Sequence, residues 1–150
     1  SELPYRLLLR ASGCDLCYSP MYHADEFVDD VAEEGFSTCQ ADRPLIVQFC
    51  AKEPDDFLEA ALAVQDRCDA VDLNLGCPQP KALKAGWGSA LMDEEHWHLV
   101  FTMVRKAVSS SSLRVPITCK IRVFADVRKT VRFARMIEEA GCSILTVHGR

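Results

Sequence analysis

A cysteine at a sharp turn is the residue in this 150-residue chain whose setting most favours chemistry. Cys77 lies in the segment DLNLGCPQ at 72–79, where Gly76 and Pro78 favour a tight turn directly after an apolar run of strand length. A thiol held at such a turn can act as a nucleophile or as a proton donor. The alternative is a turn cysteine that packs beneath the loop that follows it.

Polar side chains in other apolar runs could bind a ligand beside this thiol. Lys120 and Arg122 are two residues apart, so on a strand they share one face, and two cations there need an anionic or electron-rich partner. The alternative is an internal ion pair, for which Asp72 is a candidate. Gln48 and Asn74 carry amides that can make paired hydrogen bonds to a flat heterocycle, or can simply cap a core.

A histidine near the end of the last apolar run could join this group. His148 could donate a hydrogen bond to a ligand carbonyl or to a phosphate. A single histidine in such a setting is more often a core residue with an internal partner. The polar residues at 74 and 120, which we expect on neighbouring strands, favour the ligand-binding interpretation.

Five short apolar runs alternate with helical patterns, and these elements must position the candidate residues. The runs cover 16–21, 45–50, 70–75, 117–123 and 143–148. Helices are expected at 3–12, 54–67, 93–108 and 126–140. Nearly continuous apolar runs are typical of strands covered on both faces, and repeated strand–helix units predict a parallel α/β sheet. Such a sheet is either doubly wound or closed into a barrel.

The polar ends of the strands favour the barrel. The last four runs each have an apolar face and a second face that becomes polar toward the C-terminal end, which is typical of the mouth of a TIM barrel. A doubly wound sheet has polar ends mainly near its switch point and usually carries a Gly-rich phosphate loop, but the sequence has no G-x-G-x-x-G motif. We therefore predict an incomplete TIM (β/α)8 barrel, since five strands are too few to close one and ~250 residues is the usual length.

Composition and charge limit the function classes. Hydrophobic residues make up 49% of the chain and charged residues 26%, as in an ordinary globular protein, and no apolar run of ~18 residues predicts a transmembrane helix. The net charge of −5 does not indicate a nucleic-acid binder, so contact with RNA would need a local basic patch or another domain. The eight cysteines lie mostly in apolar runs, which favours a reducing compartment, the cytoplasm or else the nucleus. The pair Cys14 and Cys17 has no second pair to support a zinc or redox site.

Taken together, these motifs resemble those of the tRNA-dihydrouridine synthase family. The resemblance rests on four stretches: RPLIVQF at 43–49, DLNLGCPQ at 72–79, PITCKIRVF at 116–124 and AGCSILTVHGR at 140–150. It covers essentially the whole chain and is most similar to the eukaryotic type that acts at positions 16 and 17 of the tRNA D-loop.

The resemblance implies an FMN-dependent barrel enzyme. In this family NAD(P)H reduces FMN, hydride passes from the reduced flavin to C6 of a uracil flipped out of the tRNA, and a cysteine protonates C5 to give 5,6-dihydrouridine. The residue that matches the cysteine is Cys77. This agrees with the chemistry of the residues, because C5 becomes enolate-like after hydride addition and a placed acid then lowers the barrier.

The resemblance also assigns the polar residues. The flavin contacts match Gln48, Lys120 and His148, with Asn74 beside both flavin and substrate, and Arg122 matches a position near the substrate. A cation such as Lys120 at the pyrimidine edge of the flavin would stabilise negative charge on the reduced ring.

The family pattern extends beyond this sequence and differs from it at one loop. The resemblance implies a first strand before Ser1, two further strands with the flavin-phosphate site after Arg150, and then a helical tRNA-binding domain. In the loop after Cys77, Lys84 is followed by Ala85 where the family usually has glycine. Two other functions remain open: an FMN barrel that reduces a free small molecule, and an inactive fragment or scaffold.

Overall fold

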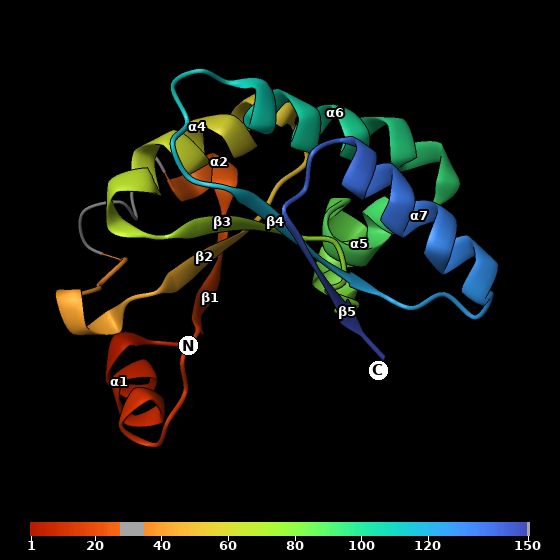
Figure 1. Cartoon of the computed structure of the whole chain (residues 1–150). Helices are drawn as coiled ribbons and strands as arrows, with labels where there is room; N and C mark the ends of the chain where they lie inside the picture. The colour runs from red at the N-terminus through yellow and green to blue at the C-terminus, as the bar shows by residue number, and fades with distance from the viewer. Residues whose placement is uncertain (28–34, 150) are drawn as a thin grey trace.

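A curved parallel sheet forms the centre of the molecule (Figure 1). The computed structural model describes residues 1–27 and 35–149, so Arg150 of the last motif lies outside the described residues. The strands are β1 (Cys17–His23), β2 (Leu45–Cys50), β3 (Ala70–Asn74), β4 (Ile117–Arg122) and β5 (Ile144–His148). They lie side by side in chain order, and all four pairings are parallel.

This strand order supports the barrel prediction at the level of architecture. A doubly wound sheet reverses its strand order at a switch point, and this sheet does not. The hydroxyl groups of Tyr18 on β1 and Thr146 on β5 are 3.4 Å apart, although these strands are the two edges of the sheet. The sheet therefore curls on itself, as part of a TIM barrel wall does.

Three helices form a layer on the outer face of the sheet (Figure 1). They are α4 (Pro54–Val64), α6 (Trp97–Ser109) and α7 (Val127–Glu139). The shorter α-helices are α1 (Leu3–Ala11), α2 (Ala24–Glu26) and α5 (Pro80–Ala85). The 3-10 turns are η2 (Gln40–Asp42), η3 (Gln65–Arg67), η4 (Gly88–Met92) and η5 (Glu94–His96).

Local sequence explains where the long helices begin and end. Pro54 occupies the first turn of α4 and is followed by two acids, which suit the positive end of a helix. At the start of α7 the Asp126 carboxylate accepts a hydrogen bond of 2.8 Å from the Arg128 backbone N–H. The same helix ends before Gly141, whose φ of +104° is a left-handed conformation that favours glycine.

The main core lies between the outer face of the sheet and this helical layer. Val47, Phe49 and Leu73 are fully buried on the sheet side, and Phe57 and Phe133 are fully buried on the helix side. Burial of each such side chain contributes roughly 1.5–3 kcal/mol, so this layer stabilises the curvature that brings the strand ends together.

The predicted elements agree with the structure within a few residues, except after Cys77. The four predicted helices and all five predicted strands are present. The sequence did not predict α5 and η4, which follow the cysteine turn and shape the region beside it. Among the described residues, no helix is long and apolar enough to cross a membrane.

Candidate functional site

A row of hydrogen-bonded polar side chains crosses the inner face of the sheet. Asn74 Nδ2 donates to Gln48 Oε1 (2.9 Å), and Gln48 Nε2 donates to Asp72 Oδ2 (2.8 Å). Thr118 Oγ1 donates to the other oxygen, Asp72 Oδ1 (2.6 Å). The row follows from strand register, because Gln48 pairs with Asp72 and Asp72 pairs with Thr118 in adjacent strands. Each carboxamide NH2 group uses one N–H in this row and keeps one for a ligand.

The buried carboxyl of Asp72 anchors the row. Its side chain is completely inaccessible to solvent. Burial raises its pKa, while the hydrogen bonds from Thr118 and Gln48 and the nearby charge of Lys120 act in the opposite direction. Both oxygens accept from neutral groups, and among the described residues no ion pair joins Asp72 to Lys120 or Arg122. Polar contacts from the adjacent strands satisfy this carboxyl instead.

The turn that carries Cys77 is held from two sides. Asn74 Oδ1 accepts hydrogen bonds from the backbone N–H groups of Gly76 (3.0 Å) and Cys77 (2.9 Å). The guanidinium of Arg122 on β4 donates through Nε to the Gly76 carbonyl (2.7 Å). The turn is therefore fixed to both β3 and β4.

The segment after α5 closes over the same turn. The Ser89 backbone N–H donates to the Cys77 carbonyl (3.0 Å), and a Cβ at Gly88 would lie 2.9 Å from both Cys77 Cβ and Cys77 O. Gly88 also has a φ of +65°, so both space and backbone conformation require glycine there. Cys77 is partly buried and packs against a small cluster formed by Cys50, Ala82 and Trp87.

The other candidate residues lie on β4 and β5 at the same end of the sheet. Asn74 pairs in register with Lys120, and Arg122 pairs with His148. Among the described residues, no carboxylate is in ion-pair contact with the Lys120 ammonium group. The structure thus brings all the sequence-predicted site residues to the C-terminal ends of β2 to β5 and to the turn after β3.

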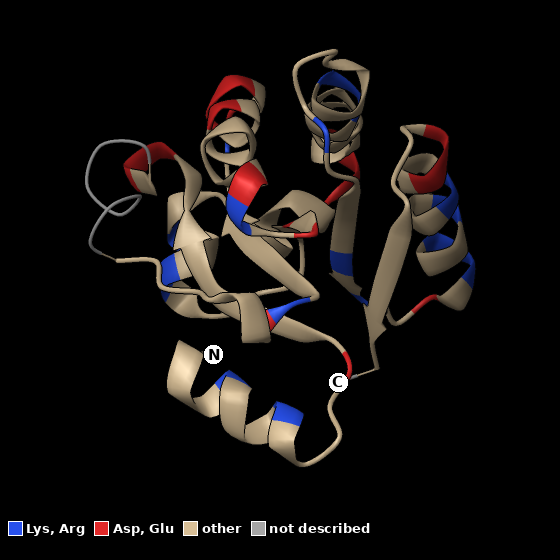
Figure 2. Ribbon diagram, turned by 60° about the vertical axis from the view of Figure 1, so that its left-hand side comes forward, with Lys and Arg blue, Asp and Glu red and all other residues tan. Residues whose placement is uncertain are grey.

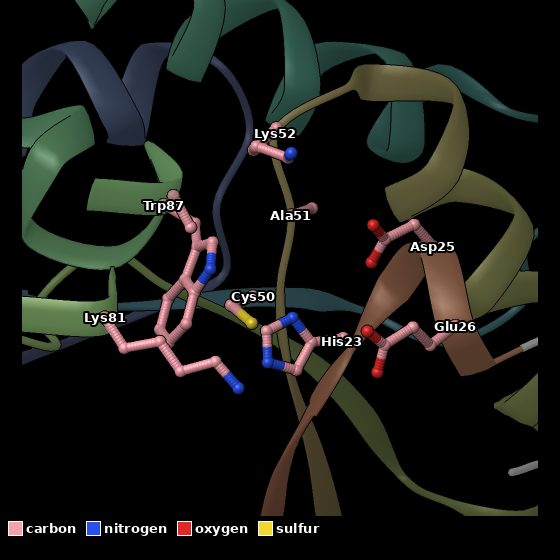
Figure 3. Close-up of a pocket in the computed structure, with 9 residues that line it drawn as sticks. His23, Asp25, Glu26, Cys50, Ala51, Lys52, Lys81 and Trp87 are labelled. Carbon is pink, nitrogen blue, oxygen red and sulfur yellow. The ribbon is translucent and has the colours of Figure 1, made fainter. Parts of the chain in front are cut away.

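Two clefts flank the cysteine turn. One has a volume of about 200 Å³ and is lined by the ends of β1 and β2 and by α5 (Figure 3). The other, of about 380 Å³, is lined by Pro78 and Arg122 among others. Trp87 lines the first cleft and packs in the cluster that contacts Cys77, so the thiol turn separates the two openings.

Sequence reasoning gave no role to several residues that shape this site. Thr118 satisfies Asp72, and the Ser19 hydroxyl accepts a 3.0 Å hydrogen bond from the Gln48 backbone N–H. Tyr18 contacts Thr146 across the sheet. The signal for Thr118 was its position on the same strand face as Lys120, whereas nothing local indicates the contact across the curved sheet.

A cysteine pair and a series of basic residues lie outside the row. The Cys14 and Cys17 sulfur atoms are 3.8 Å apart, and within residues 1–27 and 35–149 no group of three or more His, Cys, Asp or Glu residues is arranged to hold a metal. Basic residues lie along α7 (Figure 2), where Lys129 and Arg132 both pair with Glu94 (3.7 and 3.1 Å). Arg132 and Glu94 are exposed and Lys129 is half-buried, and surface ion pairs of this kind contribute little to stability.

A curled parallel sheet with polar strand ends around a fixed cysteine turn is consistent with part of an α/β barrel. The family model for dihydrouridine synthase (Dus) matches residues 1–150. The chain belongs to the dihydrouridine synthase family.

The relatives share the whole of this chain but are much longer. A rat tRNA-dihydrouridine(16/17) synthase-like protein is 53% identical over 100% of this chain and 34% of its own length. The tRNA-dihydrouridine(16/17) synthase of Schizosaccharomyces pombe is 49% identical over 100% of this chain and 38% of its own length. A mouse tRNA-dihydrouridine(20a/20b) synthase-like protein is 40% identical and is covered over 47% of its length. All three names include NAD(P)+. The chain spans about a third to a half of the length of these curated relatives.

Proposed function

We propose that this chain is part of a tRNA-dihydrouridine synthase that reduces uridine at D-loop positions 16 and 17, with NAD(P)H as reductant and FMN as cofactor. The observation that carries the proposal is the row of hydrogen-bonded polar side chains on β2 to β4 beside the fixed Cys77 turn. The relatives at 53% and 49% identity whose names specify positions 16 and 17 support the choice of uridines.

The donors present fit the pyrimidine edge of a flavin. That edge alternates carbonyl acceptors with an N–H, and Gln48 and Asn74 each keep a free amide N–H on adjacent strands. Lys120, in register with Asn74, would place a cation beside the same edge, and His148 on β5 would complete the set. When bound, FMN would supply to C6 of the uracil the hydride that it takes from NAD(P)H.

Cys77 would act as the acid. As negative charge develops at C5 of the uracil, the S–H bond breaks, a C5–H bond forms, and the resulting thiolate takes a proton from solvent. The two hydrogen bonds from the backbone to Asn74 Oδ1 hold the thiol turn in one geometry before substrate arrives. Arg122 fixes the turn through the Gly76 carbonyl and also lines the cleft of about 380 Å³, where it could contact the substrate. The uracil must leave its stack to reach this position.

The five strands would be strands 2 to 6 of the complete barrel. β1 and β5 are the edges of the sheet, and the chain covers about a third of the rat relative. Strand 1, strands 7 and 8 with the flavin-phosphate site, and a helical tRNA-binding domain would belong to other parts of the full-length protein. A tRNA substrate and eight cysteines that are all free support a cytoplasmic location, with the nucleus as the other site of tRNA processing.

Replacement of Cys77 tests this function. In the full-length protein, Cys77→Ala should retain FMN and the oxidation of NADPH but lose dihydrouridine formation by at least the ~10²-fold that a positioned acid contributes. Cys39→Ala is the matched control, because Cys39 is an exposed thiol outside the site. Dihydrouridine would be quantified by mass spectrometry of an unmodified tRNA transcript.

Three results would contradict the proposal. Normal tRNA reduction by Cys77→Ala would remove the role of the thiol. Efficient reduction of free uracil by the wild-type protein without any need for tRNA would indicate a small-molecule reductase. A colourless full-length protein without flavin absorbance would indicate a scaffold.

A further inference from the structure

The cleft of about 200 Å³ beside the thiol turn carries charges of both signs (Figure 3). Lys81 and Trp87 come from the segment that follows Cys77 and form one side of the cleft, whereas Lys52 lies two residues beyond β2, at one end of the cleft. Asp25 and Glu26 come from α2 on the other side, and Cys50 lies at the base between the walls. His23 extends across the opening, where its ring meets the Trp87 ring edge to face with centroids 5.0 Å apart.

The charged groups in this cleft are available to a ligand. Both lysines and both acids are exposed, and among the described residues neither lysine takes part in an ion pair. Lysine ammonium groups suit a phosphate, and carboxylates accept hydrogen bonds from the N–H groups of a base. A cleft with one cation on its side, a second cation at its end, carboxylates on the opposite side and an aromatic contact between them fits a nucleotide.

Trp87 both lines the cleft and packs in the cluster that contacts the thiol turn. Trp87 is buried, with 4% of its surface exposed, and packs with Cys50 and Ala82 in the cluster that contacts Cys77. Its backbone N–H donates to the Ala82 carbonyl (3.1 Å), and the next residue, Gly88, lies against Cys77. The segment that forms one side of the cleft therefore also packs against Cys77.

We propose that this cleft binds the nucleotide next to the uridine that is being reduced, with the phosphate on one side of that nucleotide at Lys52, the phosphate on its other side at Lys81, and its base toward Asp25 and Glu26. This inference rests on the proposed function. Relatives with 53% and 49% identity are named for positions 16 and 17, which are consecutive in the RNA chain. While one of these uridines is at Cys77, the other is only one backbone step away and needs a place at the rim.

The size of the cleft favours a single nucleotide over a dinucleotide cofactor. Pockets that enclose drug-sized ligands have volumes of ~300–1,000 Å³. A volume of about 200 Å³ is too small to enclose NAD(P)H and matches part of one nucleotide whose remainder is exposed to solvent.

The test measures tRNA binding by the full-length protein as a function of salt. Each phosphate contact that is removed from a single-stranded segment lowers the salt slope, d log K/d log[salt], by about 0.7. Lys52→Ala and Lys81→Ala should each reduce the slope by that amount, and the double variant by about 1.4. Lys106→Ala is the charge-matched control, because Lys106 lies on α6, pairs with Asp55 and does not line this cleft. That variant should leave the slope unchanged.

A second readout separates the cleft from the flavin reaction. The double variant should change the ratio of dihydrouridine at positions 16 and 17, mapped in the product tRNA, while the rate of flavin reduction by NADPH stays at the wild-type value. Unchanged salt slope and product ratio in the double variant would overturn the inference. A raised KM for NADPH with an unchanged salt slope would overturn it in favour of a cofactor site. Absence of any dihydrouridine from the wild-type protein would instead overturn the proposed function itself.

Discussion

The polar row has a fixed direction, and Asn74→Asp tests it. Asn74 Oδ1 is held by two backbone N–H groups, so its Nδ2 must donate to Gln48 Oε1, and Gln48 Nε2 must then donate to Asp72. An aspartate at 74 keeps the oxygen that accepts from the backbone but replaces the amide nitrogen with a second oxygen. In the wild-type structure that nitrogen lies 2.9 Å from Gln48 Oε1, so the variant would place two acceptor oxygens against each other. Gln48 cannot resolve this by turning its amide, because its oxygen would then face Asp72.

The expected cost of Asn74→Asp follows from the hydrogen bond between residues 74 and 48, which the new carboxylate cannot make. One hydrogen bond contributes about 1 kcal/mol, and an acceptor without a partner in a buried setting costs about 1–3 kcal/mol. Asn74 is only 7% exposed, so Asn74→Asp should lower the free energy of unfolding by about 2–4 kcal/mol at pH 7.5.

The destabilisation should depend on pH with a defined sign. A protonated carboxyl can donate to Gln48 Oε1, so the folded state raises the pKa of the introduced carboxyl above its unfolded value of ~3.9. Stability is then greatest below that unfolded value and falls as the pH rises through the folded-state pKa. Urea unfolding of the full-length protein, followed by tryptophan fluorescence between pH 4 and 8, measures this difference relative to wild type.

Asp72→Asn is the matched control for the direction of the row. Its oxygen can still accept from Gln48, its new NH2 group can donate to the Thr118 hydroxyl, and the buried charge is removed. We expect a change of less than ~1 kcal/mol, because the weaker hydrogen bonds of the neutral amide are offset by the removal of the desolvation cost. A stable Asn74→Asp variant with no dependence on pH would refute the fixed direction of the row.

Two more substitutions test a buried ion pair in the fold and the glycine that lies against Cys77. Asp42→Ala removes the carboxylate that accepts hydrogen bonds from Arg6 Nε (2.9 Å) and Nη2 (2.7 Å). Because both side chains are completely buried, the free energy of unfolding, measured with urea at pH 7, should fall by about 3–5 kcal/mol. Burial tends to raise the Asp42 pKa, but the hydrogen bonds and charge of Arg6 outweigh it and hold the pKa below its ordinary value. The difference in free energy of unfolding between wild type and Asp42→Ala should therefore disappear as the pH falls through that lowered pKa. A difference that persists at pH 2 would contradict this. Gly88→Ala introduces a Cβ 2.9 Å from Cys77 Cβ and O at a φ of +65°, so it should displace the thiol and lower kcat for dihydrouridine by about 10-fold or more with NADPH-dependent flavin reduction unchanged. Equal effects on both reactions would show that Gly88 acts on the fold and not on the thiol.

The sheet and its polar end could be predicted because they depend on local patterns. Alternation along the strands placed Asp72 and Asn74 on the face opposite Leu73, and the structure agrees. The pattern could not show which polar groups bond to one another, and so the ion pair considered for Asp72 is replaced by contacts to Thr118 and Gln48. Hydrogen-bond partners on adjacent strands depend on register, which periodicity alone does not give.

The segment after Cys77 could not be predicted for a different reason. Its short helix, α5, has too few residues for a periodic signal, and its position depends on Gly86 at a φ of +81° and on the packing of Trp87 against Cys50. Lys52 and Lys81 are far apart in the sequence and carried no motif, yet the fold brings them to one cleft. Tertiary contacts, not local propensity, create this part of the site.

One side chain connects the two functions proposed for the site. Asn74 Nδ2 sets the orientation of Gln48, which is the amide proposed to lie beside the flavin, while Asn74 Oδ1 holds the turn of Cys77, the proposed acid. Because a carboxamide is planar and rigid, the direction of the donor row and the position of the thiol are fixed relative to each other before any ligand binds. Such preorganisation lowers the cost of positioning in the reaction, since the groups that meet the ring and the group that supplies the proton do not need to be ordered separately. A substitution at 74 must therefore disturb both functions together, whereas a substitution at Cys77 can separate them.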